Sequence, residues 1–243
     1  MPRPKKTFLS AEWRDLVMLN YEVNPACLQK YVPAGTELDS FHGKTYLSLV
    51  GFRFCRTKLL GALPIPFHTE FEEINLRFYV RRHEGTEIRR GVVFIAEIVP
   101  KRAIALTARL FYGENYVRRP MAHRVLTNES KMEAEYSWIS GNEWCKLQAH
   151  ASGTPSLPAQ GGLEQFITEH YWGYSRQPEG GTVEYHVSRV PWKVWNASKA
   201  EFLGETSDLY GDELSAVLTK APASAFIADG SPVIVCRGHR LSS

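Results

Sequence analysis

Apolar and polar residues alternate with a period of two through most of the chain, which is typical of β-strands with one buried face. In residues 71–82, one face carries apolar Ile74 and Leu76, and the other carries polar Glu73 and Arg77. The polar face either meets water or lines the hollow of a curved sheet, and the pattern leaves both open. Nine such segments predict strands: 13–23, 44–54, 71–82, 91–99, 132–139, 143–151, 181–190, 191–202 and 231–238.

Turn residues separate several of these segments and favour antiparallel pairing through hairpins. These turns have the sequences HEGTEI before Arg89, SGN before Glu143 and ADG before Ser231. Three short helices are predicted at 24–31, 162–170 and 207–220, the first capped by Asn24 and the last by Ser207. The fold class is therefore mainly β with minor helices.

Residues 101–112 fit two structures. Ile104, Leu106 and Ala108 alternate as in a strand, whereas Ile104, Ala108 and Phe111 share one face of a helix that begins after Pro100. We prefer the helix, and the strand stays open.

Composition narrows the protein class without giving a function. The 243 residues are 44% hydrophobic and 23% charged, and we expect one domain over 1–243 in which the basic segment 1–9 is a flexible arm. The apolar runs are too short to span a bilayer and no secretory signal is present, so we expect a soluble, cytoplasmic protein. The net charge of +3 is dispersed, which disfavours nucleic acid and membrane partners. A homo-oligomer stays open.

Known cofactor and metal motifs are missing from the sequence. FHGKT at 41–45 resembles part of a phosphate loop, but Leu38 stands where the first glycine is required. Dinucleotide, serine-hydrolase and zinc motifs do not occur, and the eight histidines are scattered. We therefore expect neither a metal nor a cofactor.

The segment TEHYWGYSR, 168–176, combines an acid, an imidazole, three aromatic rings and an arginine. Aromatic faces with polar tips suit the wall of a ligand pocket. The alternative is an aromatic core corner in which Glu169 pairs with Arg176. On the first interpretation, the binding residues are Glu169, His170, Tyr171, Trp172 and Tyr174.

Charged residues interrupt the apolar run FIAEIVPKRAIALTARLF, 94–111. The strand before Pro100 is apolar on both faces, so Glu97 should be paired in the core. Lys101 and Arg102 follow the strand, and a lysine beside a fixed cation loses proton affinity and becomes a nucleophile. The alternative is a solvated corner, with Glu97 bonded to Arg77 or Arg109.

Five blocks of the sequence resemble the uncharacterised YqjF-like family, whose fold is similar to that of acetoacetate decarboxylase. These blocks are AEWRDLVMLNYEV, YLSLVGFRF, PIPFHTEFEEINLRFYVRR, FITEHYWGYSRQ and ASAFIADGSPVIV. VPKR at 99–102 resembles the decarboxylase motif Y-P-K-K, which matches Lys101 to the imine-forming lysine and Arg102 to its neighbour. NYEVNPACLQKYVPAGTELD at 20–39 resembles a second decarboxylase segment, from which Arg14 matches the strand arginine.

The resemblance implies an antiparallel β-barrel or curved sheet that encloses a pocket, and a cofactor-free lyase or decarboxylase that forms a lysine imine with a small keto acid. The decarboxylase glutamates fall near Tyr46 or Ser48 and near Lys58, so other acids must replace them. The implied catalytic residues are Lys101, Arg102 and Arg14. The full set of expected binding residues is Glu97, Glu73, Arg77, Glu169, His170, Tyr171, Trp172 and Tyr174. The alternative function is a non-catalytic protein that binds a small apolar or amphipathic molecule in the same pocket.

Overall fold

Strands make up most of the computed structural model, which describes residues 6–60, 63–64, 69–100, 115–128 and 130–241. The strands are β1 (Thr7–Val23), β2 (Glu37–Leu38), β3 (Thr45–Leu59), β4 (Leu63–Pro64), β5 (Phe71–Glu84), β6 (Glu87–Val99), β7 (Tyr116–Arg118), β8 (Met121–Thr127), β9 (Lys131–Ser140), β10 (Glu143–Ser152), β11 (Trp172–Arg176), β12 (Thr182–Arg189), β13 (Val194–Leu203), β14 (Ser224–Cys236) and β15 (His239–Arg240). The helices are α1 (Pro25–Gln29), α3 (Leu163–Thr168) and α4 (Ser207–Leu218). This composition confirms the mainly β fold class.

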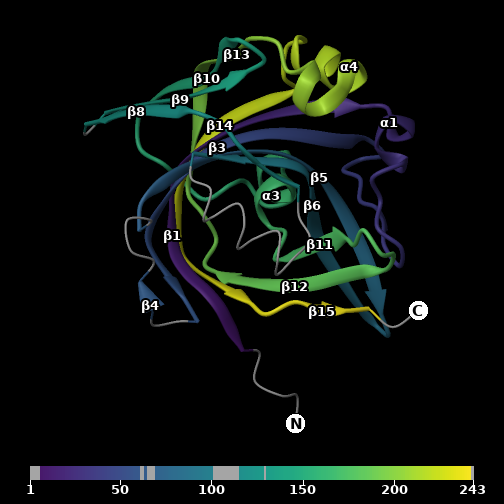
Figure 1. Cartoon of the computed structure of the whole chain (residues 1–243). Helices are drawn as coiled ribbons and strands as arrows, with labels where there is room; N and C mark the ends of the chain where they lie inside the picture. Colours follow the sequence, from purple (N-terminus) through teal and green to yellow (C-terminus); the bar gives the residue numbers. More distant parts are fainter. Residues whose placement is uncertain (1–5, 61–62, 65–68, 101–114, 129, 242–243) are drawn as a thin grey trace.

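Seven of these strands close into a barrel, in the order β12, β11, β6, β5, β3, β1 and β14. The ring closes where β14 returns to β12 and Val235 pairs with Val187. All pairs in the ring are antiparallel except the short parallel pair of β6 with β11. Figure 1 shows the long strands β1, β3 and β5 curving around an interior that β12 bounds on the other side. The predicted antiparallel barrel is thus confirmed.

A second sheet covers part of the outer wall of the barrel. The first half of β14 pairs with β13, and the sheet continues through β10 and β9 to β8 (Figure 1). Outward residues of β1, β3 and β5 pack with Tyr136, Trp138 and Leu147 of this sheet and with Leu214 of α4. Inward residues form a separate core. The central barrel strands are therefore buried on both faces, which stabilises the walls around the interior.

The ADG sequence before Ser231 predicts a hairpin turn, and this prediction is wrong. The sequence lies inside β14. Gly230 has φ +76°, and a Cβ there would lie 1.9 Å from the carbonyl oxygen of Trp13. The opposite strand has a bulge between Arg14 and Val17, where Asp15 has φ 57°. Glycine at 230 therefore lets two bent strands approach closely, and this need produces the same sequence signal as a turn.

The helices occur at the predicted positions, but only one of the two predicted cap residues is confirmed. Asn24 caps α1 by accepting a hydrogen bond from the Ala26 N–H at 3.0 Å, as predicted. At α4, Thr206 and not Ser207 is the cap residue, and the Glu205 carboxylate accepts the Ser207 N–H at 2.8 Å. None of the helices in the described part of the chain is long and apolar enough to cross a membrane.

Other segments differ from expectation or lie outside the described residues. β1 already begins at Thr7, so residues 7–9 belong to the barrel and not to the flexible arm predicted for 1–9. The predicted strands omit β8, because most of its side chains are exposed and its sequence lacks an apolar face. They also omit the short strands β2, β4, β7, β11 and β15. The helix preferred for 101–112 lies outside the described residues.

Candidate functional site

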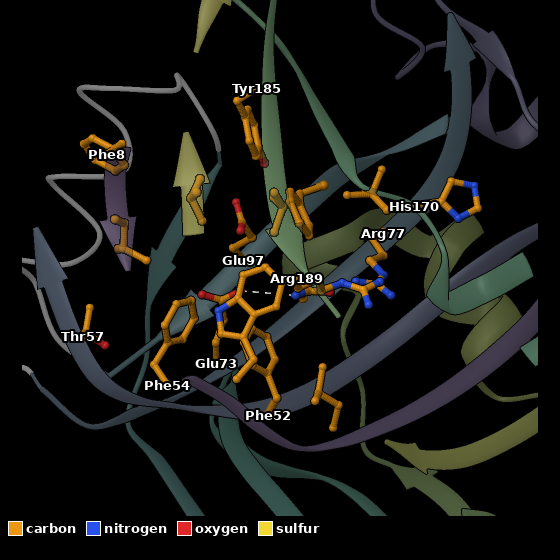
Figure 2. Close-up of a pocket in the computed structure, with 18 of the residues that line it drawn as sticks. Phe8, Phe52, Phe54, Thr57, Glu73, Arg77, Glu97, His170, Tyr185 and Arg189 are labelled. Carbon is orange, nitrogen blue, oxygen red and sulfur yellow. Dashed lines mark hydrogen bonds between the residues drawn. The ribbon is translucent and has the colours of Figure 1, made fainter. Parts of the chain in front are cut away.

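The barrel encloses a cavity of about 120 Å³ between the inner faces of its strands (Figure 2). Aromatic and aliphatic side chains form most of its wall: Phe8, Leu9, Trp13, Leu16, Phe52, Phe54, Leu59, Phe71, Val92, Phe94, Tyr116, Trp172, Tyr185, Val187, Trp192 and Val235. Its polar lining residues are Thr57, Glu73, Asn75, Arg77, Glu97, Thr168, His170 and Arg189. A largely apolar cavity with a few convergent polar groups is the usual form of a small-molecule site.

The polar face of β5 supplies three of these groups. Glu73, Asn75 and Arg77 alternate along the strand and therefore point to the same side, into the cavity. On the neighbouring strand, Glu97 is paired with Asn75, so both glutamates adjoin the Asn75 position, Glu73 along β5 and Glu97 across from it on β6. Both glutamates are only 2% exposed. Closure of the barrel therefore decides between the two alternatives that the sequence left open, in favour of the cavity.

Glu73 is held in place by its neighbours. The Asn75 amide donates to Glu73 Oε1 at 3.2 Å, and the Tyr116 hydroxyl lies 3.5 Å from Oε2. The side chain of Glu97 points into the same cavity (Figure 2). Two carboxylates in a largely apolar cavity are suited to accepting and donating protons.

Two arginines bring positive charge to the cavity. Arg189, at the end of β12, donates to the Thr168 carbonyl, and its guanidinium carbon lies 3.8 Å from the centre of the Trp192 ring and 4.7 Å from that of Tyr171. Burial, together with the nearby charge of Arg77, lowers the Arg189 pKa to about 10. Arg189 is still charged at neutral pH, so two cations line the same cavity (Figure 2). Such a pair favours an anionic ligand.

His170 lines the cavity beside Arg77 and is held by a buried carboxylate. Its ring packs against those of Tyr79 and Phe166, with ring centres 4.6 and 5.0 Å away. Its Nε2 is 3.3 Å from Asp39 Oδ2, and Asp39 also accepts from Arg90 at 2.8 and 3.2 Å.

The protonation states of this pair follow from its environment. Burial lowers the pKa of His170 to about 4, so the imidazole is neutral at neutral pH. Burial alone raises the pKa of Asp39, but hydrogen bonds from His170 and Arg90 outweigh that effect and bring it below its ordinary value. An ionised Asp39 therefore accepts the Nε2–H of a neutral His170.

Five buried polar atoms of the cavity residues have no hydrogen-bond partner within the described part of the chain. They are Trp13 Nε1, Thr57 Oγ1, Asn75 Oδ1, Arg77 Nε and His170 Nδ1. Each unsatisfied buried group costs about 1–3 kcal/mol, and native proteins contain few of them. Their concentration around one cavity indicates that a ligand or ordered water supplies the missing partners.

The structure brings together five of the residues expected from sequence to bind substrate. Glu73, Arg77, Glu97, His170 and Trp172 all line the cavity. In the segment 168–176, the pocket-wall interpretation therefore fits His170 and Trp172, which come from opposite ends of a short connection into β11.

Three residues expected in the same set lie elsewhere among the described residues. Glu169 accepts from the Gln165 amide at 3.3 Å, and Tyr174 donates to Glu184 at 2.9 Å. Tyr171 packs against the guanidinium of Arg189 and is not among the described lining residues. The pairing of Glu169 with Arg176 is also not seen, since Arg176 donates to the Lys30 carbonyl.

Of the expected catalytic residues, only Arg14 belongs to the described part of the chain, and it does not line this cavity. Arg14 pairs with Glu12 at 2.7 Å and is absent from the described lining. Its neighbour Trp13 points inward, and since successive side chains of a strand alternate, Arg14 projects from the other face. Lys101 and Arg102 lie outside the described residues.

Sequence reasoning missed Arg189, Asn75 and the aromatic residues Trp13 and Trp192. Asn75 could have been found, because it lies between Glu73 and Arg77 on the same strand face. Arg189 gave no signal, because it ends an ordinary strand segment. In the described residues, no group of three or more His, Cys, Asp or Glu side chains is arranged to hold a metal ion.

Comparison with solved structures places this fold among known enzymes. Acetoacetate decarboxylase from Legionella pneumophila subsp. pneumophila str. Philadelphia 1 superposes with a TM-score of 0.69 at 13% identity, covering 100% of this chain and 92% of that one. The enduracididine biosynthesis enzyme MppR, solved in complex with pyruvate, gives a TM-score of 0.64 at 17% identity over 100% of this chain and 92% of its own. At these identities the likeness shows the fold alone.

Sequence comparison gives the family. The uncharacterized protein YqjF of Bacillus subtilis (strain 168) is 24% identical over 204 residues, which cover 82% of this chain and 80% of that protein. The model of the DUF2071 family, described as an uncharacterized conserved protein, matches residues 10–232. Because this match spans nearly the whole chain, the protein belongs to the DUF2071 family, to which the YqjF resemblance pointed, and it has the acetoacetate decarboxylase-like fold.

Proposed function

We propose that the cavity binds a small keto acid and that the chain is a cofactor-free enzyme that forms an imine between this acid and Lys101. One observation carries the proposal: Arg77 and Arg189 share a mostly apolar cavity inside the barrel with the buried carboxylates of Glu73 and Glu97. The arginines hold the substrate carboxylate, and the glutamates exchange protons with the reacting carbons.

The size of the cavity supports a small substrate. Its volume of about 120 Å³ is close to that of an engineered cavity of about 150 Å³ that binds benzene. A keto acid of a few carbon atoms has a similar size. The likeness to acetoacetate decarboxylase and to the pyruvate-bound MppR supports the same class of ligand.

In the proposed reaction, the Lys101 amine attacks the ketone carbon and water leaves as the imine forms. The protonated imine nitrogen then accepts the electron pair of the bond that breaks, either the bond to a carboxylate, which leaves as carbon dioxide, or a C–H bond, whose proton a glutamate accepts. Protonation of the resulting enamine and hydrolysis of the imine return the free lysine.

Of the two arginines that the resemblance implied to be catalytic, only Arg102 keeps a role in this scheme. Arg102 cannot lose its proton, and its fixed charge beside Lys101 in the sequence favours the neutral, nucleophilic amine. Arg14 was expected to orient the substrate, but its guanidinium is engaged by Glu12. We therefore assign that role to Arg77 and Arg189.

The test is borohydride reduction in the presence of pyruvate, acetoacetate or 2-oxobutanoate, followed by mass spectrometry. We expect one reduced adduct per chain, located on Lys101, and none in Lys101→Ala. Lys131→Ala, which alters an exposed lysine of β9, is the matched control and should trap as the wild type does. The imine proposal is wrong if the wild type forms no adduct, or if Lys101→Ala is trapped equally.

A second function is favoured by the aromatic side of the cavity. Trp13 packs edge to face with Phe52, Phe54 and Trp192, with ring centres 5.6 to 6.2 Å apart. This apolar wall also suits a non-catalytic protein that binds an amphipathic molecule. Such a protein would be stabilised thermally by its ligand without turnover, and Lys101→Ala would leave that stabilisation unchanged.

A further inference from the structure

Two of the unpartnered polar atoms belong to side chains that both lie close to the ring of Tyr79. The His170 ring centre lies 4.6 Å from that of Tyr79, and the Arg77 guanidinium carbon lies 5.8 Å from it. Both side chains are buried, with exposed fractions of 1% for the His170 side chain and 8% for residue Arg77. Within the described part of the chain, His170 Nδ1 and Arg77 Nε have no hydrogen-bond partner (Figure 2).

The hydrogen-bonding roles of these two atoms are opposite. Asp39 is ionised and accepts hydrogen bonds from Arg90 and from the Ser40 N–H. Because an ionised carboxylate can only accept, His170 faces it with Nε2–H. A neutral imidazole that donates through Nε2 carries its lone pair on Nδ1, which is therefore an acceptor. Arg77 Nε is always a donor.

A ligand group that satisfies both atoms must accept one hydrogen bond and donate another. A carboxylate or ketone oxygen cannot donate, and an ammonium group cannot accept and would be repelled by Arg77. A hydroxyl group does both.

Because both atoms belong to residues that line the same cavity, we infer that the keto acid bound there carries a hydroxyl group, which accepts from Arg77 Nε and donates to His170 Nδ1. The inference rests on the proposed function and adds the substrate class: a hydroxylated keto acid. In this arrangement Asp39 is a positioning residue, because it acts on the ligand only by fixing the His170 tautomer.

The test compares matched ligand pairs by isothermal titration calorimetry, with the wild type and with Lys101→Ala, which excludes turnover. The pairs are pyruvate with hydroxypyruvate, and 2-oxobutanoate with 4-hydroxy-2-oxobutanoate. We expect the hydroxyl group to tighten binding at least about tenfold in one pair, since without it a buried donor and a buried acceptor lack hydrogen-bond partners. His170→Phe should remove this advantage.

Asp39→Asn provides a measurement that would not change if Asp39 had a purely structural role. The new amide donates to His170 Nε2, which moves the imidazole proton to Nδ1 and turns that atom into a donor. The ratio of affinities for 4-hydroxy-2-oxobutanoate and 4-fluoro-2-oxobutanoate, whose fluorine cannot donate, should then fall about tenfold. Asp208→Asn, on α4 and outside the described cavity lining, should leave the ratio unchanged.

The outcomes separate the inference from the proposed function. Equal binding within both pairs means that a water occupies the place of the hydroxyl, which overturns the inference and leaves the keto acid site standing. An unchanged ratio in Asp39→Asn overturns it as well. If no keto acid of either pair binds, the proposed function and the inference both fail.

Discussion

The imidazole of His170 and the carboxylate of Asp39 form a buried pair in which Nε2 lies 3.3 Å from Oδ2 and neither side chain is more than 1% exposed. The two residues are 131 positions apart in the chain. His170 lines the cavity, whereas Asp39 lies behind it and is held by Arg90. The pair therefore fixes a polar atom at the cavity wall without leaving an uncompensated charge.

Acid should weaken the fold through His170. Its pKa is about 4 in the folded protein against an ordinary 6.5, so between these pH values the unfolded chain binds a proton that the folded chain does not. The free energy of unfolding should therefore fall by about 3 kcal/mol as the pH drops from 6.5 to 4. Urea unfolding at a series of pH values measures this change.

The matched variants isolate the histidine from other titrating groups. His170→Asn should flatten the pH dependence over this range by about the same 3 kcal/mol. His42→Asn, at an exposed position whose positive φ asparagine tolerates, should keep the wild-type slope. A slope in His170→Asn equal to that of the wild type would show that His170 contributes nothing to acid sensitivity.

Removing a cavity cation should weaken binding of an acid ligand. Arg77→Met keeps a long apolar side chain but removes the charge and its donors, which is expected to weaken pyruvate binding about 10- to 100-fold. Titration calorimetry measures the affinity. Arg124→Met, at an exposed arginine of β8, should bind as the wild type does. Equal affinities of the two variants would remove Arg77 from the site.

Gly230 should tolerate no side chain. Its φ of +76° and the 1.9 Å approach of a Cβ to the Trp13 carbonyl combine backbone strain with a clash against backbone. We expect Gly230→Ala to destabilise the fold by more than about 3 kcal/mol in urea unfolding, or to prevent folding.

Gly43 separates strain from clash, because it has φ +77° and open space around its Cβ position. Gly43→Ala should cost only about 1 kcal/mol. If both variants lose the same stability, the close approach of β1 and β14 is not a constraint on the fold.

A buried carboxylate ties the end of the β5–β6 hairpin to β12. Glu184, whose side chain is fully buried, accepts from Arg89 at 2.7 Å, from Arg82 at 3.4 Å and from Tyr174 at 2.9 Å. Glu184→Ala leaves these donors unsatisfied and should cost about 3–5 kcal/mol in urea unfolding.

The matched control for this variant is Glu213→Ala. Its carboxylate pairs with Lys30 at 3.3 Å, and both side chains are more than half exposed. Exposed ion pairs add little to stability because solvent screens them, so this variant should unfold nearly as the wild type does. A comparable loss in the two variants would contradict the structural role of the Glu184 cluster.

Local sequence patterns predicted most of the strands, because alternation reports directly on which face of a strand is buried. Alternation does not predict the exposed strand β8, because neither of its faces is buried. The glycine at 230 predicts a turn wrongly, because glycine serves two purposes. Positive φ is required in a hairpin turn and equally in a bend within a long strand. Only the neighbouring strand shows which of these is present.

For the candidate site, the sequence predicts some of the lining residues and omits others. The alternating Glu73 and Arg77 were recognised as one polar face, and His170 and Trp172 as parts of a pocket wall. Arg189 was missed, because its role depends on Trp192 and Tyr171 packing against its guanidinium and on barrel closure that brings β12 opposite β5. Arg14 matched a family position but faces Glu12.

The sequence by itself determined the mainly β class, the positions of the long strands and the capped start of α1, since each depends on residues close together in the chain. The tertiary structure alone decided that the polar face of β5 lines a cavity, that Asp39 fixes His170, and that Arg77 and Arg189 line the same cavity. These relationships arise from closure of the ring between β12 and β14, which joins segments that no local pattern relates.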